Sequence, residues 1–178
     1  DLLGRLVIKG MNAQPDIAGM TLAFNPNALD GIDAGYINHV YSDPVGRFLP
    51  YFSRVEDGIE VETLVLAPET GAEVWYDLPQ AEDRTVVTPP YTYPLNGADT
   101  LLTSVSVVVH KRGAPAGILR SDLKLENFSS MISSLRPFDV GNVMLISDAN
   151  TWIATPKASQ IGQPISGEES ARLLNADL

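Results

Sequence analysis

The sequence has no cysteine and only two histidines, His39 and His110, in 178 residues. The lack of cysteine excludes disulfides, thiolate zinc sites and thiol nucleophiles. The histidines form neither an H-E-x-x-H motif nor a pair at metal-ligand spacing, and there is no P-loop, no G-x-G-x-x-G motif and no G-x-S-x-G motif. We therefore expect a protein that is not an enzyme and that carries no cofactor and no metal.

Positive charge is also scarce. Twelve Lys and Arg residues are set against twenty-two Asp and Glu residues, which gives a net charge of −10. This balance argues against nucleic acid as a partner, because phosphates require clustered Lys and Arg side chains. It argues equally against docking on anionic lipid. The negative charge is compatible with cationic ligands, although most of the acids are expected only to keep the protein soluble.

Long hydrophobic runs are absent, so this stretch of sequence is not expected to span a bilayer. Hydrophobic residues make up 44% of it and charged residues 19%, which is typical of a soluble globular domain. It begins at Asp1 without an initiator methionine or a signal peptide, and we expect it to be part of a longer protein.

The hydrophobic periodicity predicts an α+β fold on an antiparallel sheet, followed by the opening of a second, similar unit. The clearest signals are two hairpins, with turns at Asp57-Gly58 and Arg112-Gly113. The expected elements are the end of a helix over residues 2–14, a strand over 17–25, strands over 46–55 and 59–66, a short helix or loop over 71–84, an extended segment over 85–94, two long strands within 98–125, a helix over 126–137, a hairpin over 141–156 with its turn at 148–150, and a short C-terminal helix.

Four aromatic residues and one acid form the strongest candidate site. Trp75 and Tyr76 are adjacent in a polar segment, and Tyr91 and Tyr93 point to the same side of an extended one. Asp122 ends a mostly apolar strand. Aromatic faces attract cations, and a carboxylate behind them would supply the formal charge. The pattern alone leaves two interpretations open: a pocket for a cation, or core aromatics with Asp122 as the cap of the following helix.

The chain resembles the double-Cache (dCache_1) ligand-binding domain of bacterial chemoreceptors, the methyl-accepting chemotaxis proteins. Four stretches carry the resemblance in the family's order and together cover nearly the whole chain. They are "FNPNALDGIDAGYIN" with "GRFLPYFSR", "WYDLP", "PPYTYPLNGADTLLTSVSVVV", and "GAPAGILRSDLKLENFSSMI" with "VMLISDANTWIATPKASQIGQPI".

The resemblance implies a long N-terminal helix, mostly missing here, followed by two PAS-like modules with central antiparallel sheets. The first, membrane-distal module usually binds the ligand. The implied divisions are residues 1–14 as the end of the helix, 15–122 as the distal module, 123–137 as a connecting helix and 138–178 as part of the membrane-proximal module.

The resemblance also implies ligand contacts, position by position. The family's Trp-Tyr pair is matched by Trp75 and Tyr76, and its next pocket tyrosine by Tyr91. The strand-end Asp that holds a ligand amine in family members is matched by Asp122.

Other positions depart from the family's pattern. Amino-acid-binding members carry an Arg two residues before the Trp and an Asp two residues after the tyrosine; Glu73 and Tyr93 stand here instead. These changes resemble the amine-binding members, and Glu73 and Tyr93 join the expected ligand contacts. The family's Trp before "PNALDG" is replaced by Phe24, and a usually small residue by Arg120. Arg120 could pair with Asp122 and weaken its charge, or read a ligand carboxylate.

We therefore expect a periplasmic sensor domain of an inner-membrane chemoreceptor that binds a small amine or quaternary ammonium compound and signals across the membrane. The full receptor is expected to be a homodimer anchored by flanking helices. The alternatives are an amino-acid or organic-acid sensor that uses Arg120, and a Cache module of a histidine kinase or cyclic-dinucleotide enzyme that binds no small ligand directly.

Overall fold

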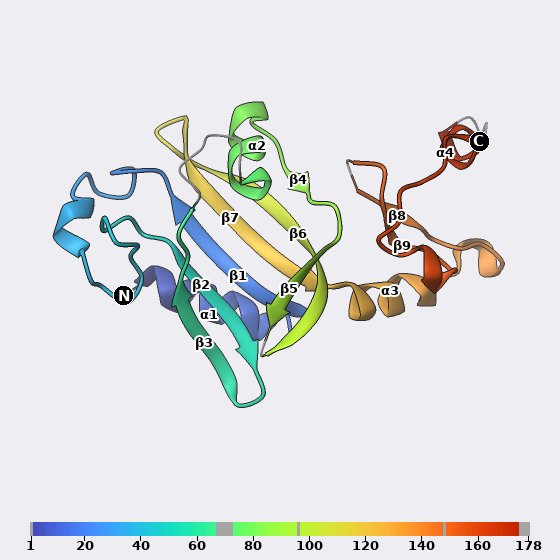
Figure 1. Ribbon diagram of the computed structural model, residues 1–178, viewed down its shortest axis with the longest axis horizontal. Coiled ribbons are helices and arrows are strands. Elements are labelled where there is room, and N and C mark those ends of the chain that lie inside the picture. The colour runs from blue at the N-terminus through green and yellow to red at the C-terminus, as the bar shows by residue number, and fades with distance from the viewer. Residues whose placement is uncertain (1, 67–72, 96, 148, 175–178) are drawn as a thin grey trace.

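A seven-stranded sheet forms the centre of the structure, a computed structural model that describes residues 2–66, 73–95, 97–147 and 149–174 (Figure 1). Its strand order is β3-β2-β1-β7-β6-β4, and β5 pairs with β6 as well. All these pairs are antiparallel. The strands are β1 (Ile17–Phe24), β2 (Pro50–Val55), β3 (Gly58–Thr63), β4 (Val86–Val87), β5 (Tyr91–Leu95), β6 (Ala98–Lys111) and β7 (Ala114–Lys124).

One helix covers each face of the sheet, as Figure 1 shows. These are α1 (Leu2–Ala13) and α2 (Val74–Glu82). The buried residues of α1 include Val7 and Met11, which follow helical spacing and pack against Met20 of β1 and Phe52 of β2. Because successive strand residues point to opposite faces, the neighbouring residues Thr21 and Tyr51 lie on the α2 side.

Tight turns hold the two longest hairpins in register. β2 and β3 join through Glu56-Asp57, with Gly58 at φ 145° opposite Val55. β6 and β7 join at Arg112 and Gly113, whose φ angles are 54° and 82°. Positive φ at both central residues of the β6–β7 turn is what a type I′ turn requires, and that turn matches the right-handed twist of the strands.

A smaller unit follows the sheet. α3 (Leu125–Ser134) leads away from the end of β7 to a two-stranded sheet of β8 (Leu145–Ile146) and β9 (Trp152–Ala154) (Figure 1). The three residues of β9 are buried. The remaining elements are the 3₁₀ helices Asp33–Tyr36, Pro137–Asp139 and Ala158–Gln160 and the helix α4 (Gly167–Leu174).

These elements confirm the predicted α+β class with its central antiparallel sheet and N-terminal helix. The segment 71–84, expected as a helix or a loop, contains the helix α2. The hairpin around residues 148–150 is present, although Asp148 lies outside the described residues. The domain divisions at residues 14, 122 and 137 stay predictions. Among the described residues, no helix is both long and apolar enough to cross a membrane.

Gly19 on β1 permits the close approach of Tyr51, and we predict that Gly19→Ala disrupts it. An added Cβ would lie 2.1 Å from the Tyr51 hydroxyl oxygen. We expect chemical denaturation to show a loss of about 1–3 kcal/mol in the free energy of unfolding, because the ring must move. The control is Gly10→Ala in α1, where an added Cβ meets nothing within 4 Å. A loss no larger than that of the control would contradict the prediction.

Candidate ligand-binding site

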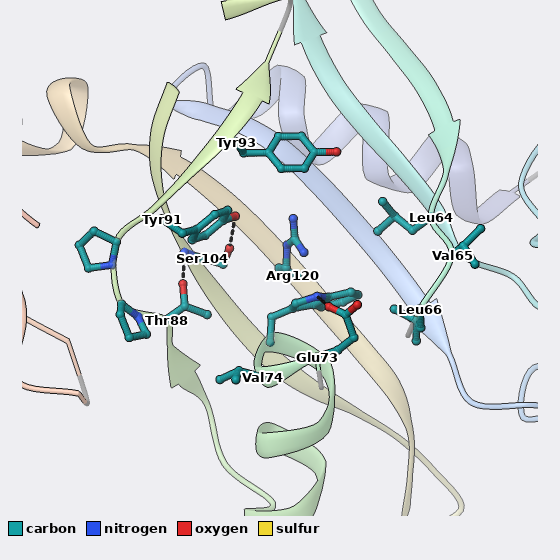
Figure 2. A pocket seen from close by; sticks show the side chains of 13 residues that line it. Leu64, Val65, Leu66, Glu73, Val74, Thr88, Tyr91, Tyr93, Ser104 and Arg120 are labelled. Carbon is teal, nitrogen blue, oxygen red and sulfur yellow. Dashed lines mark hydrogen bonds between the residues drawn. The ribbon is translucent and has the colours of Figure 1, made fainter. Parts of the chain in front are cut away.

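A cavity of about 540 Å³ lies between the α2 face of the sheet and the start of α2 (Figure 2). Its walls are completed by the residues that follow β3, by the Pro89-Pro90 segment and by β5. Its lining residues are Leu64, Val65, Leu66, Glu73, Val74, Trp75, Thr88, Pro89, Pro90, Tyr91, Tyr93, Ser104 and Arg120. Most of this surface is apolar or aromatic, and Glu73 and Arg120 are its ionisable acid and base.

Below the cavity, Asp122 is buried completely and accepts four hydrogen bonds. Arg120 donates Nε to Oδ1 over 2.7 Å and Nη2 to Oδ2 over 2.6 Å. Ser104 donates its hydroxyl to Oδ1 over 2.6 Å, and Tyr51 donates its hydroxyl to Oδ2 over 2.9 Å. A carboxylate offers about four lone-pair positions, so Asp122 is saturated by the protein itself.

The sheet register explains why these groups meet. Arg120 and Asp122 are two apart on β7 and therefore point to the same face. Ser104 of β6 and Gly19 of β1 stand directly opposite Asp122 on its two neighbouring strands. Because Gly19 has no side chain, the ring of Tyr51 crosses over it from β2 to reach the carboxylate.

Proton donation in this network runs in one direction. The Ser104 hydroxyl has a single proton, which it gives to Asp122, so the Tyr91 hydroxyl must donate its own proton to Ser104 over 2.8 Å. The Tyr91 hydroxyl oxygen then keeps only acceptor capacity. Tyr91 lines the cavity, and its hydroxyl points toward Ser104 (Figure 2).

The Arg120 side chain is 7% exposed and lies between aromatic rings. Its guanidinium carbon is 4.5 Å from the centre of the Trp75 ring and 5.6 Å from that of Tyr51, both within cation–π range. In Figure 2 the Arg120 side chain lies beside Tyr91 and points toward the Tyr93 ring. Asp122 and these rings together fix its orientation.

Glu73 and Trp75 form the wall that α2 contributes. The Trp75 indole N–H donates to the Glu73 carboxylate over 2.8 Å. This bond holds the indole with its face toward Arg120 and leaves the Glu73 carboxylate on the cavity lining. On the opposite wall, the Tyr93 ring meets Tyr51 edge to face, and its hydroxyl donates to Glu62 over 3.3 Å.

The network shifts the ionisation of its members. Burial and the negative charge of Asp122 raise the pKa of Tyr91 to about 12 and that of Tyr51 further above its usual range. Burial lowers the pKa of Arg120, but the charge of Asp122 and the hydrogen bonds to it outweigh burial and raise that pKa overall. Arg120 therefore keeps its positive charge, and both tyrosines are neutral, at physiological pH.

The predicted site residues separate into two groups. Trp75, Tyr91, Tyr93, Glu73 and Arg120 all line the cavity. The other three do not line the cavity. Asp122 lies beneath Arg120, and Phe24 meets Phe48 edge to face. Tyr76 lies in the core with Ala23, Leu49 and Ile118.

The alternative in which Asp122 caps the following helix is wrong. Asp122 lies inside β7, its carboxylate is committed to the network, and the N-cap position of α3 is Lys124. The alternative of purely core aromatics applies to Tyr76, which is 7% exposed and bonds Asn25 through its hydroxyl. Within the described residues, no group of three or more His, Asp or Glu side chains is placed to hold a metal ion.

Sequence reasoning missed Tyr51 and Ser104. Ser104 and Ser106 alternate with valines along β6, which is a signal for polar side chains on one buried face. Tyr51 has no comparable signal, because its role depends on Gly19 in another strand.

Residues 3–130 match the family described as "Methyl-accepting chemotaxis protein-like, first PDC sensor domain". The chain belongs to this family. The sensor-domain match covers α1, the whole seven-stranded sheet and the cavity. The predicted relationship to chemoreceptor sensor domains is thereby confirmed, whereas the amine-binding subtype stays a prediction.

Individual relatives agree with this family. The chain is 27% identical over 165 residues to the methyl-accepting chemotaxis protein TlpQ of Pseudomonas aeruginosa, a match that covers 84% of this chain and 23% of TlpQ. Among solved structures, it is similar to the extracellular domain of mmHK1S-Z2, described as a histidine kinase, with 30% identity, a TM-score of 0.69 and coverage of 89% of this chain and 58% of the other. It is also similar to "Methyl-accepting Chemotaxis protein X", with 25% identity, a TM-score of 0.68 and coverage of 97% and 63%. The sensor domain thus spans less than two thirds of each.

We predict that Asp122→Leu lowers the free energy of unfolding by about 3–5 kcal/mol, because it leaves the buried Arg120 cation unpaired. Replacing both members, Arg120→Met with Asp122→Leu, should restore part of that loss, since no unpaired buried charge remains. Urea denaturation measures both. The pairing would be contradicted if the double variant lost as much free energy of unfolding as Arg120→Met and Asp122→Leu lose in sum.

We also predict a pH dependence from Tyr91. Its pKa is raised from about 10 in the unfolded chain to about 12 in the fold. Its contribution to stability is therefore fully present below pH 10 and is lost as pH rises through about 12. Urea denaturation of the unaltered chain and of the Tyr91→Phe variant, each from pH 8 to 12, measures this contribution as the difference between their free energies of unfolding. The prediction fails if the variant removes a tyrosinate absorbance signal that titrates near pH 10.

Proposed function

We propose that this chain is the extracytoplasmic, ligand-sensing domain of a transmembrane chemoreceptor, and that its cavity binds a small molecule with a cationic nitrogen. The domain is not expected to catalyse a reaction. Membership of the chemoreceptor-like sensor family supports the sensing role. The chemistry of the cavity wall supports the class of ligand.

The observation that carries the proposal is a wall built of aromatic rings beside a carboxylate. Trp75, Tyr91 and Tyr93 line the cavity, and the Glu73 carboxylate lies next to the Trp75 indole. An ammonium group gains from ring faces roughly 0.5–2 kcal/mol each, depending on how far it is desolvated. Glu73 supplies the formal negative charge on the same wall.

Two features of the network favour a cation further. The Tyr91 hydroxyl gives its proton to Ser104, so its oxygen keeps acceptor capacity that an ammonium N–H can use. Arg120 and Asp122 cancel as charges. Glu73 is then the acidic side chain that the lining presents.

Signalling would follow from the position of the cavity on the sheet. The ligand would contact the face of β6 and β7 that α2 covers, whereas α1 packs on the other face of β1. Closure of α2 over a ligand would shift the sheet against α1, which in the homodimeric, membrane-anchored receptor would carry the signal. A ligand can shift such an equilibrium only by its different affinity for the two states.

A second candidate is a sensor of organic acids that bind Arg120, and the position of its guanidinium at the cavity supports it. A module that binds no small ligand finds less support, because the space between Trp75 and Tyr93 is a cavity rather than a packed core.

Thermal unfolding in the presence of choline, putrescine, acetate and succinate tests the proposal. We predict that the two amines raise the melting temperature and that the two acids do not. Glu73→Gln should weaken the amines by about tenfold through loss of the formal charge, whereas the exposed control Glu56→Gln should leave their affinities unchanged. Stabilisation by the acids alone would contradict the proposal and favour the second candidate.

A further inference from the structure

A second cavity, of about 320 Å³, lies between the start of α1 and the long segment that joins β1 to β2. Leu3 of α1 lines it, and its other lining residues come from positions 29–48, which lie beside the N-terminal end of α1 (Figure 1). An added Cβ at Gly4 would lie 3.0 Å from the Tyr41 hydroxyl oxygen, so the helix and the segment pack closely here. Among the residues that the structure describes, none lines both this second cavity and the cavity beside α2.

Two buried acids of this segment differ in how they are satisfied. Asp43 accepts hydrogen bonds from the backbone N–H groups of Val45 and Arg47, and the Arg47 side chain pairs with it over 3.1 Å. Asp33 is 8% exposed, and its Oδ2 accepts the Asn27 backbone N–H over 2.6 Å. Within the described part of the chain, its Oδ1 has no hydrogen-bond donor and the carboxylate forms no ion pair. Buried carboxylates normally have such partners, so Asp33 keeps acceptor capacity that the protein does not use.

A lysine reaches the same segment but does not serve Asp33. Lys111, at the end of β6, donates its ammonium to the carbonyl oxygens of Ala28 and Leu29, each over 2.8 Å. Its side chain does not line the second cavity. The partner that Asp33 lacks can therefore come from a molecule in the cavity, because Asp33 is one of the lining residues.

The rest of the lining is mainly apolar and aromatic. Leu3, Leu29 and Phe48 supply hydrocarbon surface. Tyr36 also lines the cavity, and a hydrogen bond to Asp30 together with the charge of Asp30 raises the pKa of Tyr36. The cavity thus combines a second acid with surface that suits an uncharged hydrocarbon or aryl group.

We propose that the second cavity binds a protonated primary amine that carries an apolar group. The ammonium donates to Oδ1 of Asp33, and the apolar group packs against Leu29 and Phe48. A single free oxygen suits one N–H donor better than the two-pronged fork of a guanidinium, and a quaternary ammonium has no N–H to donate. The bound amine would touch both α1 and the segment 29–48, and would hold them together. This site is independent of the ligand proposed for the cavity beside α2.

Three matched probes test the class of ligand: 2-phenylethylamine, 2-phenylethanol and trimethyl(2-phenylethyl)ammonium. They share the phenylethyl group and differ in whether the end is an ammonium with N–H donors, a neutral hydroxyl or a cation without N–H. By calorimetry on the Glu73→Gln variant, which weakens the first cavity for amines, we expect the primary amine to bind at least about tenfold more tightly than either of the others. Equal binding of the alcohol or of the trimethyl compound would overturn the proposal.

Nuclear magnetic resonance on the unaltered chain locates the bound amine. The Asn27 amide reports on Asp33, because it donates to that carboxylate, and the Trp75 indole N–H reports on the first cavity, because it donates to Glu73. We expect 2-phenylethylamine to shift the Asn27 amide resonance at a concentration set by the affinity of the second cavity. If only the Trp75 signal shifts, the amine binds in the first cavity alone, and the inference is overturned while the proposed function stands.

Asp33→Asn assigns the effect to the carboxylate. The amide keeps an oxygen for the Asn27 N–H but removes the charge, so the affinity for 2-phenylethylamine should fall by at least about tenfold while that for 2-phenylethanol changes by less than about threefold. The matched control is Asp57→Asn, at an exposed position in the β2–β3 turn, and it should change neither affinity. Unchanged amine binding in the folded Asp33→Asn variant would overturn the inference, and the resonance of Asn27 in the unaltered chain decides if that variant does not fold.

Discussion

The buried pair of Arg120 and Asp122 is the interaction on which the ligand site depends. Each charge would be costly alone in the interior, and each is tolerated because the other lies 2.6–2.7 Å away. Tyr51 and Ser104 fill the remaining acceptor positions of the carboxylate. The result is a cation fixed on the floor of a cavity whose walls are mainly aromatic and apolar, with a net charge of zero beneath the ligand.

The fold supplies this pair with side-chain hydrogen-bond partners from two other strands, β6 and β2. Alternation along β7 puts Arg120 and Asp122 on one face, and the antiparallel register sets Ser104 and Gly19 opposite Asp122. The missing side chain at Gly19 is what lets Tyr51 cross from β2. The same alternation sends Met20 and Phe52 to the other face, where α1 packs. The cavity and the helix α1 thus lie on opposite faces of the sheet.

Sequence reasoning predicted the elements because they depend on local spacing, whereas the pattern of the aromatic residues left a pocket and a core both open, and only the family resemblance favoured the pocket. The two-residue spacings of Tyr91 with Tyr93 and of Arg120 with Asp122 determine shared faces in any strand. Whether Asp122 faces a ligand or is saturated could not be derived, because Tyr51 is 71 residues away in the sequence. The distinction between Trp75 in the cavity and Tyr76 in the core likewise depends on which side of α2 meets the sheet.

A crystal structure of the chain with the amine that stabilises it most tests the central claim most directly. The account predicts that the four hydrogen bonds to Asp122 remain as they are in the free chain. The ligand nitrogen should lie against Trp75 and Glu73. A ligand nitrogen bonded to Asp122, with the Arg120 guanidinium displaced from it, would contradict the account.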